Sequence, residues 1–246
     1  MLALKLGESL PSNNAAAIGS NAYSLQFTGT EYGSNDDFYR AFLSPNQTYR
    51  GSISIWTSIS TMTASGYIFR IVGDAQNLMQ LQYHASSKEI RFAYRGNNIN
   101  KTVVFDATAL ENDGAWHHIF ITYNFSVPEM KIYLDSVLED TNTDTLGFIS
   151  TLATSFDVGQ NGSDANYYKG YLSEFSWFTE VIPVAQVTSE NGDYPVDVSG
   201  MTSLVGYWRF NEGSGTTALG SGGYGSGYSL TLYNTPTWST STPTSP

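Results

Sequence analysis

The sequence predicts an all-β protein, a two-sheet antiparallel β-sandwich, and three observations support this prediction. Aromatic residues make up 14% of the 246 residues and charged residues only 13%, a composition that favours strands over helices. Short runs of alternating apolar and polar residues recur along the chain, as at Met79, Leu81 and Tyr83, and this period is typical of half-buried strands. The 23 glycines suit the many turns that such strands require.

The predicted strands follow one another at turn-sized spacing, which is typical of a sandwich or jelly roll. They are Tyr23–Phe27, Ser52–Ser58, Tyr67–Val72, Leu78–His84, Ile90–Tyr94, Lys101–Phe105, Trp116–Tyr123, Met130–Leu134, Ser155–Val158, Tyr168–Phe178, Leu204–Phe210 and Ser229–Tyr233. Helical signal is confined to two short turns. These are expected at Asp106–Asn112 and at Pro183–Val187, where proline takes a permitted first position.

We expect a single sandwich domain over residues 21–238, with less structured segments on either side. Residues 1–20 are expected to form an N-terminal arm or linker, and the Ser/Thr/Pro-rich residues 239–246 a disordered tail. A composition shift at Glu190–Gly200 is a candidate domain boundary. The roughly 45 residues that follow it are too few for a core of their own, so we expect them to add strands to the same sandwich.

Charge and composition exclude several classes of function. The net charge of −11 argues against nucleic acid and anionic membranes as partners, and no apolar run reaches the roughly 18 residues of a membrane span. The absence of cysteine excludes disulfides and thiolate catalysis. The first residues are interrupted by Lys5 and Gly7 and do not form a secretory signal. We therefore expect either a signal that has been removed or a route outside general secretion.

A series of motifs follows one another in a characteristic order. They are S-L-x-F-x-G in Ser24–Thr30, G-x-W-H-H with alternating apolar residues in Asp113–Tyr123, K-I-Y-L-D-S in Lys131–Ser136, F-D-V-G in Phe156–Gly159, and Y-K-G-Y-L-S-E-F in Tyr168–Phe175. In this order they resemble the laminin-G-like, or concanavalin A-like, jelly-roll superfamily. Two positions depart from its pattern, because Ser136 replaces a glycine and Ser173 replaces an aspartate.

The resemblance implies two packed antiparallel sheets and, for most laminin-G-like members, a binding function. Other members of the superfamily are glycan-active enzymes, so the fold alone does not decide the function. The segment Leu204–Thr217 resembles one that usually precedes the strand at Ser24–Thr30. Either the sandwich is permuted, or an incomplete second repeat begins here.

Two loops are candidates for binding carbohydrate, which aromatic rings and nearby hydrogen-bonding groups can recognise. The candidate ligand-binding residues are Tyr94, Arg95 and Asn97 in the first loop, and Asn161, Asp164, Asn166 and Tyr167 in the second. We expect four tyrosines to be exposed, Tyr94, Tyr167, Tyr168 and Tyr224. Packing in the core or at the rim is the alternative for each of them.

Calcium is the cofactor that the sequence favours. The candidate ligands are Asp36, Asp37 and Asp164, which lie in two oxygen-rich loops, and oxygen is the ligand atom that Ca²⁺ prefers. Ordinary turns are the alternative explanation, because Asn, Asp and Gly are also the usual turn residues.

Catalysis is not expected. Glycoside hydrolysis needs two carboxylates about 5–10 Å apart, whereas the strand equivalent to the catalytic strand of the enzymatic relatives offers only Glu174. His117 and His118 are adjacent on a predicted strand and so point to opposite faces. We expect both histidines to be structural.

We therefore expect a non-catalytic binding or adhesion module that recognises carbohydrate or another surface, on the exterior of a virus particle or cell. A bacteriophage particle protein suits the missing secretion signal and the absent cysteines. One alternative is a purely structural capsid or tail decoration protein, docked onto neighbouring virion subunits by residues 1–20. Another is a polysaccharide-cleaving enzyme, and a homo-oligomer is a further alternative.

Overall fold

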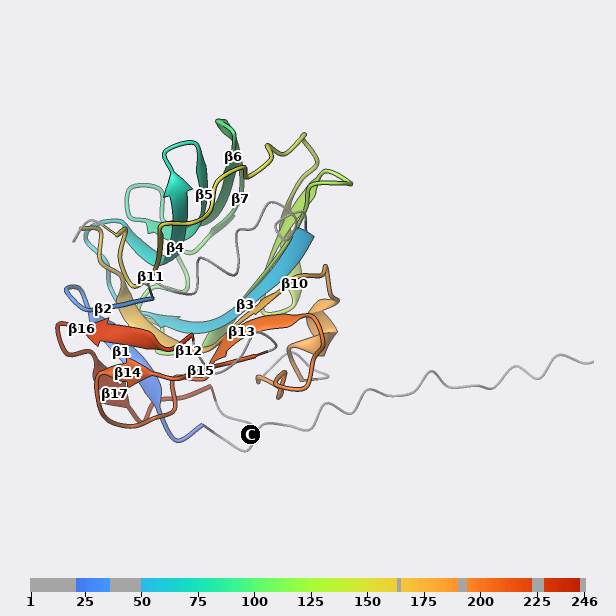
Figure 1. The fold of residues 1–246 in the computed structure, drawn as a ribbon. Coiled ribbons are helices and arrows are strands. Elements are labelled where there is room, and N and C mark those ends of the chain that lie inside the picture. Colours follow the sequence, from blue (N-terminus) through green and yellow to red (C-terminus); the bar gives the residue numbers. More distant parts are fainter. Residues whose placement is uncertain (1–20, 36–49, 163–164, 190–193, 223–227, 244–246) are drawn as a thin grey trace, which may run out of the picture.

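The chain folds into two antiparallel sheets that face each other (Figure 1). The structure is a computed structural model that describes residues 21–35, 50–162, 165–189, 194–222 and 228–243. Its one helical element among these residues is the single 3₁₀ turn η1 (Val184–Gln186), inside the turn predicted at Pro183–Val187. The predicted all-β sandwich is therefore confirmed. None of the described residues forms a helix that is long and apolar enough to cross a membrane.

The described residues contribute nine strands to the first sheet and eight to the second. The first sheet runs β10 (Val137–Asn142), β9 (Glu129–Leu134), β8 (His117–Asn124), β3 (Arg50–Ile59), β12 (Lys169–Phe178), β1 (Ser24–Thr28) and β17 (Thr237–Ser239), with β13 (Leu204–Trp208) beside β12 and β15 (Gly220–Ser221) beside β13. The second sheet runs β14 (Thr217–Ala218), β16 (Leu230–Tyr233), β2 (Tyr32–Ser34), β11 (Ser155–Val158), β4 (Gly66–Asp74), β5 (Asn77–His84), β6 (Glu89–Gly96) and β7 (Ile99–Asp106). Every strand predicted from the sequence is present, whereas β2, β10, β14, β15 and β17 were not predicted.

The core lies between the sheets and is built from the inward-facing half of each alternating strand. Ile53 of β3 and Leu81 of β5 are fully buried, as the period of two predicts. Aromatic rings join the sheets, since the rings of Phe69 in β4 and Phe175 in β12 stack with centroids 5.4 Å apart. Offset stacking adds about 1 kcal/mol to the burial of such rings.

Strand β12 changes partner along its length. Its first half pairs with β1, with Leu172 opposite Leu25, and its second half pairs with β13, with Phe175 opposite Trp208. Between the halves, Glu174 adopts a φ of 51° and the register against β3 shifts. This irregularity has the effect of a β-bulge, which re-aims a strand and its side chains.

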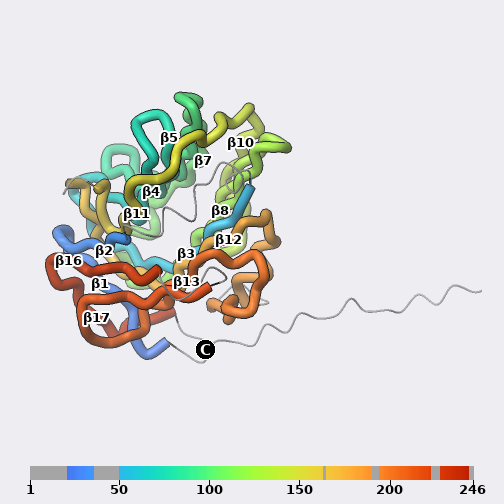
Figure 2. The backbone as a smooth tube through the Cα atoms, in the orientation of Figure 1, coloured from blue at the N-terminus to red at the C-terminus, as the bar shows by residue number. Residues whose placement is uncertain are grey.

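The C-terminal strands are built into both sheets. Figure 2 shows the blue N-terminal strands beside the red C-terminal ones, because β17 pairs with β1 and β16 pairs with β2. Strand β17 extends one residue past the predicted boundary, to Ser239. Trp116 Nε1 then donates to Ser241 Oγ over 3.2 Å, and Thr242 is only 8% exposed. The described part of the expected tail therefore packs on the sandwich, while the expected arm, residues 1–20, lies outside the described residues.

Candidate functional site

The structure separates the two loops that the sequence offers as binding sites. Arg95 and Asn97 lie at the turn from β6 to β7, where Asn98 N donates to Gln76 O of the neighbouring turn that ends β4. Asn166 lies at the opposite end of β4, where its carbonyl accepts from Tyr67 N over 3.0 Å. The predicted ligand-binding residues therefore do not form one site.

Two of the tyrosines expected to be exposed are core residues. Tyr94 is 1% exposed and Tyr168 is 0% exposed, so neither ring can stack on a sugar. Burial raises the pKa of both phenols, and Tyr168 Oη hydrogen-bonds Thr57 Oγ1 over 2.5 Å. Four other predicted residues lie outside the described part of the chain: Tyr224 and the proposed metal ligands Asp36, Asp37 and Asp164.

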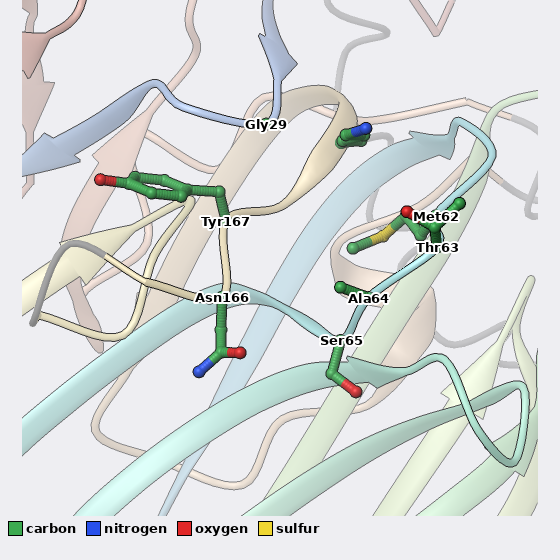
Figure 3. Close-up of a pocket in the computed structure, with 8 residues that line it drawn as sticks. Gly29, Met62, Thr63, Ala64, Ser65, Asn166 and Tyr167 are labelled. Carbon is green, nitrogen blue, oxygen red and sulfur yellow. The ribbon is translucent and has the colours of Figure 1, made fainter.

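A cavity of about 230 Å³ opens at the Asn166 end of the sandwich. We call it the rim pocket. It is lined by Gly29, Met62, Thr63, Ala64, Ser65, Asn166, Tyr167 and Lys169. Figure 3 shows Met62 to Ser65 along one loop, Asn166 and Tyr167 on the segment facing it, and the Met62 side chain pointing between them. The pocket thus contains two of the predicted ligand-binding residues, Asn166 and Tyr167.

Hydrogen bonds hold the walls of the rim pocket in place. Ser60 N donates to Lys169 O over 3.2 Å, which ties the β3–β4 loop to the start of β12. Ser65 Oγ accepts from Ala85 N over 3.1 Å, which ties the other end of that loop to the β5–β6 turn. A pocket whose walls are fixed before the ligand arrives loses less entropy on binding.

Glu31 fixes the turn that contains Gly29, on the side away from the pocket. Its carboxylate accepts the backbone N–H groups of Thr28, Gly29 and Thr30, and the two threonine hydroxyls as well. Although burial raises the pKa of Glu31, these hydrogen bonds outweigh it and lower the pKa to about 2. The carboxylate is therefore ionised. It faces the backbone of the Thr28–Thr30 turn and does not face the pocket.

Glu111 supports the opposite wall in the same way. Its carboxylate accepts from Met62 N over 2.7 Å and pairs with Lys88 Nζ. The hydrogen bond from Lys88 and then that from Met62 lower the pKa of Glu111. Both nearby acids are thus engaged outside the cavity, and Lys169 is the one charged residue among those that line it.

Lys169 lies against Gly29. An added Cβ at Gly29 would come within 2.5 Å of Lys169 Cε, so the absence of a side chain at Gly29 makes room for the lysine stem. Lys169 forms no ion pair with any residue that the structure describes. It was not predicted, because nothing in the local sequence relates it to Gly29 or to Met62, which lie more than a hundred residues away.

Three tyrosines form a row beside the pocket, which we call the tyrosine row: Tyr167, Tyr32 and Tyr233. Tyr233 is 41% exposed and its ring stacks on that of Tyr32, with centroids 4.7 Å apart and planes at 13°. The Tyr32 and Tyr167 rings lie 6.4 Å apart. In Figure 3 the Tyr167 ring points away from the Met62–Ser65 loop. The row therefore extends the lining of the pocket onto the outer face of the second sheet.

Two buried oxygens beside the second predicted loop have no hydrogen-bond partner: Asp157 Oδ2 and Gln160 Oε1. Each residue is 3% exposed, and burial raises the pKa of Asp157. Asn161 O is already engaged, because it accepts from Arg70 Nη1. Orphaned carboxylate and amide oxygens suit a hard cation such as Ca²⁺, although the described residues contain no group of three or more His, Cys, Asp or Glu side chains that could hold a metal ion.

A second cavity of about 350 Å³ lies near Glu174, the residue considered for catalysis. It is lined by Tyr207, Arg209, Asn211, Glu212, Leu219, Gly220 and Ser221, and Glu174 is not part of the lining. The Glu174 side chain is 3% exposed and accepts from Tyr207 Oη, Asn21 Nδ2 and Arg209 Nε. Burial raises the pKa of Glu174. This carboxylate joins β12 to β13 and to the N-terminal segment.

The adjacent histidines point in different directions, as expected, and both are held by the structure. His117 bridges two carboxylates, with Nδ1 2.8 Å from Asp135 Oδ2 and Nε2 2.9 Å from Asp113 Oδ2. Asp135, and then Asp113, raise the pKa of His117. His118 is fully buried with Nε2 2.8 Å from Ser54 Oγ, and burial lowers its pKa to about 3. Neither histidine lines the two cavities.

Comparisons with known proteins agree with this fold. The family model described as the concanavalin A-like lectin/glucanases superfamily matches residues 33–188, and no curated protein matches the sequence. A Bacteroides ovatus protein proposed to bind carbohydrate has a similar structure, with a TM-score of 0.64 and 14% identity over 89% of this chain. The chain spans 60% of that protein's length.

Two further similar structures are of the CBM40 module of the Ruminococcus gnavus IT-sialidase. The unliganded module has a TM-score of 0.51 and 13% identity, over 66% of this chain and 93% of the module. The module bound to α2,6 sialyllactose has a TM-score of 0.52 and 15% identity, over 68% of this chain and 97% of the module. At these identities the likeness shows a shared fold.

Proposed function

Because the chain belongs to the concanavalin A-like lectin/glucanases superfamily, we propose that it is a non-catalytic carbohydrate-binding module. The rim pocket is the observation that carries this proposal. Its walls come from three loops that hydrogen bonds fix in advance, and exposed Thr63 and Asn166 offer polar groups at its edge. Pockets of this kind fix a ligand through a few placed polar groups.

The tyrosine row extends the proposed site. Tyrosine combines a large apolar ring with a hydroxyl at modest entropic cost, so it suits the alternating apolar and hydroxyl-bearing faces of a sugar. Tyr233 is 41% exposed at the end of the row, and its outer side is where a sugar ring would pack. A glycan longer than one residue would then occupy the pocket and the row together.

The absence of catalysis is part of the proposal, and Glu174 supports it. The carboxylate is held by Tyr207, Asn21 and Arg209 and is 3% exposed. A glycosidase carboxylate must reach the scissile bond or a water beside it. Glu174 instead stabilises the junction between β12 and β13.

The similar structures support a glycan as the ligand. The R. gnavus module binds sialyllactose in one of them, and the B. ovatus protein is proposed to bind carbohydrate. Display on the exterior of a virus particle or cell remains part of the proposal. Detection of the chain in purified virions, in a secreted fraction or in the cytosol tests that part directly.

A glycan array followed by titration of two matched variants tests the proposed function. Asn166 and Asn97 are both exposed and both adopt positive φ, 52° and 48°, so replacement by glycine removes each amide without backbone strain. We expect saturable binding to a sugar class, weakened by Asn166→Gly and unchanged by Asn97→Gly. Incorporation into particles together with binding to no sugar would instead favour the structural decoration role.

We also propose that the two orphaned oxygens beside the second predicted loop belong to a calcium site. Asp157 Oδ2 and Gln160 Oε1 supply two of the oxygens, and they border the loop that contains the predicted ligand Asp164. A bound cation would give both orphaned acceptors a partner and would offset the cost of burying the Asp157 charge.

A further inference from the structure

We infer that the rim pocket selects a sugar bearing a single negative charge, a carboxylate or a sulfate ester, which pairs with Lys169. This inference rests on the proposed carbohydrate-binding function and names the class of sugar. The pocket carries a positive charge in a chain whose acids outnumber its lysines and arginines by 22 to 11. A positively charged pocket on an otherwise acidic protein is a place where an anionic ligand is favoured.

The two acids that support the pocket walls, Glu31 and Glu111, form no ion pair with Lys169. Glu31 is turned into the Thr28–Thr30 backbone, and Glu111 holds Met62 N and Lys88. Neither lines the cavity. Lys169 therefore lines the pocket without an ion pair to either carboxylate.

The pocket lining also offers hydrogen-bond donors to an anion. Ser65 Oγ accepts from Ala85 N, so its own hydroxyl hydrogen can be donated, and Thr63 and Asn166 each carry a donor. An ionised carboxylate or sulfate has several acceptor oxygens and no hydrogen-bond donor, so it suits a pocket lined by donors.

The net charge of −11 limits how charged the ligand can be. A densely sulfated or uronate-rich polymer would be repelled by the rest of the surface, whereas one acidic sugar at a chain end or branch meets mainly the pocket. The class is therefore a terminal or sparsely distributed acidic sugar.

Paired oligosaccharides test this inference. The probes are oligosaccharides that end in glucuronate, galacturonate or galactose 6-sulfate, each titrated beside its neutral glucose- or galactose-terminated parent. We expect at least one acidic form to bind about 2- to 5-fold more tightly than its parent, the range of a partly exposed charge pair. The preference should shrink as the ionic strength rises.

Variants of two lysines connect that preference to the pocket. Lys169→Gln should remove the preference for the acidic form, while Lys169→Arg keeps the preference. Lys101→Gln is the matched control, because it changes the net charge equally at a surface ion pair with Asp144 on the β7 edge. Thermal unfolding of each variant verifies that it is folded.

The outcomes separate the inference from the proposed function. Equal binding of acidic and neutral forms would overturn the inference and leave carbohydrate binding intact. A preference for the acidic form that persists in Lys169→Gln would have the same two consequences. Binding to no sugar of any charge would overturn the proposed function and the inference together.

Discussion

Gly29 and Lys169 lie in contact at the rim pocket, and an added Cβ at Gly29 would come within 2.5 Å of Lys169 Cε. Gly29 also adopts a φ of +114°, which favours glycine. We expect Gly29→Ala to reduce the free energy of unfolding by about 1 kcal/mol and to weaken binding of the acidic glycan by displacing the lysine. Chemical denaturation and glycan titration measure the two effects.

Gly114→Ala is the control for backbone strain. Gly114 adopts a φ of +77°, and an added Cβ there would have nothing within 4 Å. The variant should lose some stability and bind glycan normally. Equal loss of binding in both variants would show that the Gly29 contact with Lys169 has no part in recognition.

Tyr168 is predicted to contribute to stability and not to recognition. Tyr168→Phe removes the buried hydrogen bond with Thr57 Oγ1, which retains a second partner in Tyr171 O. We expect a loss of about 1 kcal/mol with glycan affinity unchanged. A loss of affinity without a loss of stability would instead assign Tyr168 to ligand binding.

His117 should make stability depend on pH above 6.5, its ordinary pKa. Asp135, and then Asp113, raise its pKa above the ordinary value of 6.5, so the folded state holds the proton more tightly than the unfolded state. The resulting stabilisation is complete below pH 6.5 and is lost as the pH rises through the folded-state pKa. Unfolding in denaturant from pH 6 upward measures this slope.

His117→Gln should remove that slope, and His84→Gln is the control. Burial lowers the pKa of His84, so its own contribution changes below pH 6.5 rather than above it. A slope that persists in His117→Gln would assign the pH dependence to other groups.

Glu174→Gln separates a structural carboxylate from a catalytic one. The substitution removes the charge that pairs with Arg209 and accepts from Tyr207 and Asn21. We expect it to cost roughly 3 kcal/mol of stability, because it breaks a buried charged cluster. Reducing-end assays on polysaccharides should detect no cleavage by either protein. Cleavage that the native chain performs and the variant does not would establish an enzyme.

Calcium should stabilise the protein through Asp157. A ligand at about 100 times its Kd adds about 2.7 kcal/mol, and thermal unfolding in calcium and in chelator measures the difference. Asp157→Asn should abolish the calcium effect without lowering stability in chelator, since the buried carboxylate has a raised pKa. Asp144→Asn, at an exposed ion pair, should respond to calcium like the native chain.

The fold was predictable because the alternation of apolar and polar residues along the sequence identifies the strands. The period of two through Ile90, Phe92 and Tyr94 places all three on one face, and the structure buries all three. The same period could have corrected the expectation that Tyr94 is exposed. By contrast, the turn of Glu174 to a positive φ follows from β12 pairing with two strands that are distant in sequence, and no local pattern indicates it.

The site was predictable only in part. Asn166 and Tyr167 were found because polar loop residues beside a tyrosine form a local signal. Lys169 and Gly29 were missed because their contact depends on β1 pairing with β12, where Thr28 lies opposite Lys169. Such pairings are long-range properties of the folded chain.

The most direct test of the account is to map a bound glycan on the protein by the backbone amide chemical shifts of the labelled chain. The ligand is the tightest sugar from the array, added to saturation. We expect the shifts to change at Thr63, Ser65, Asn166 and Lys169 and to remain unchanged at Asn97. Shifts confined to the cavity at Tyr207 and Arg209, or to the β6–β7 turn, would contradict the assignment of the rim pocket as the binding site.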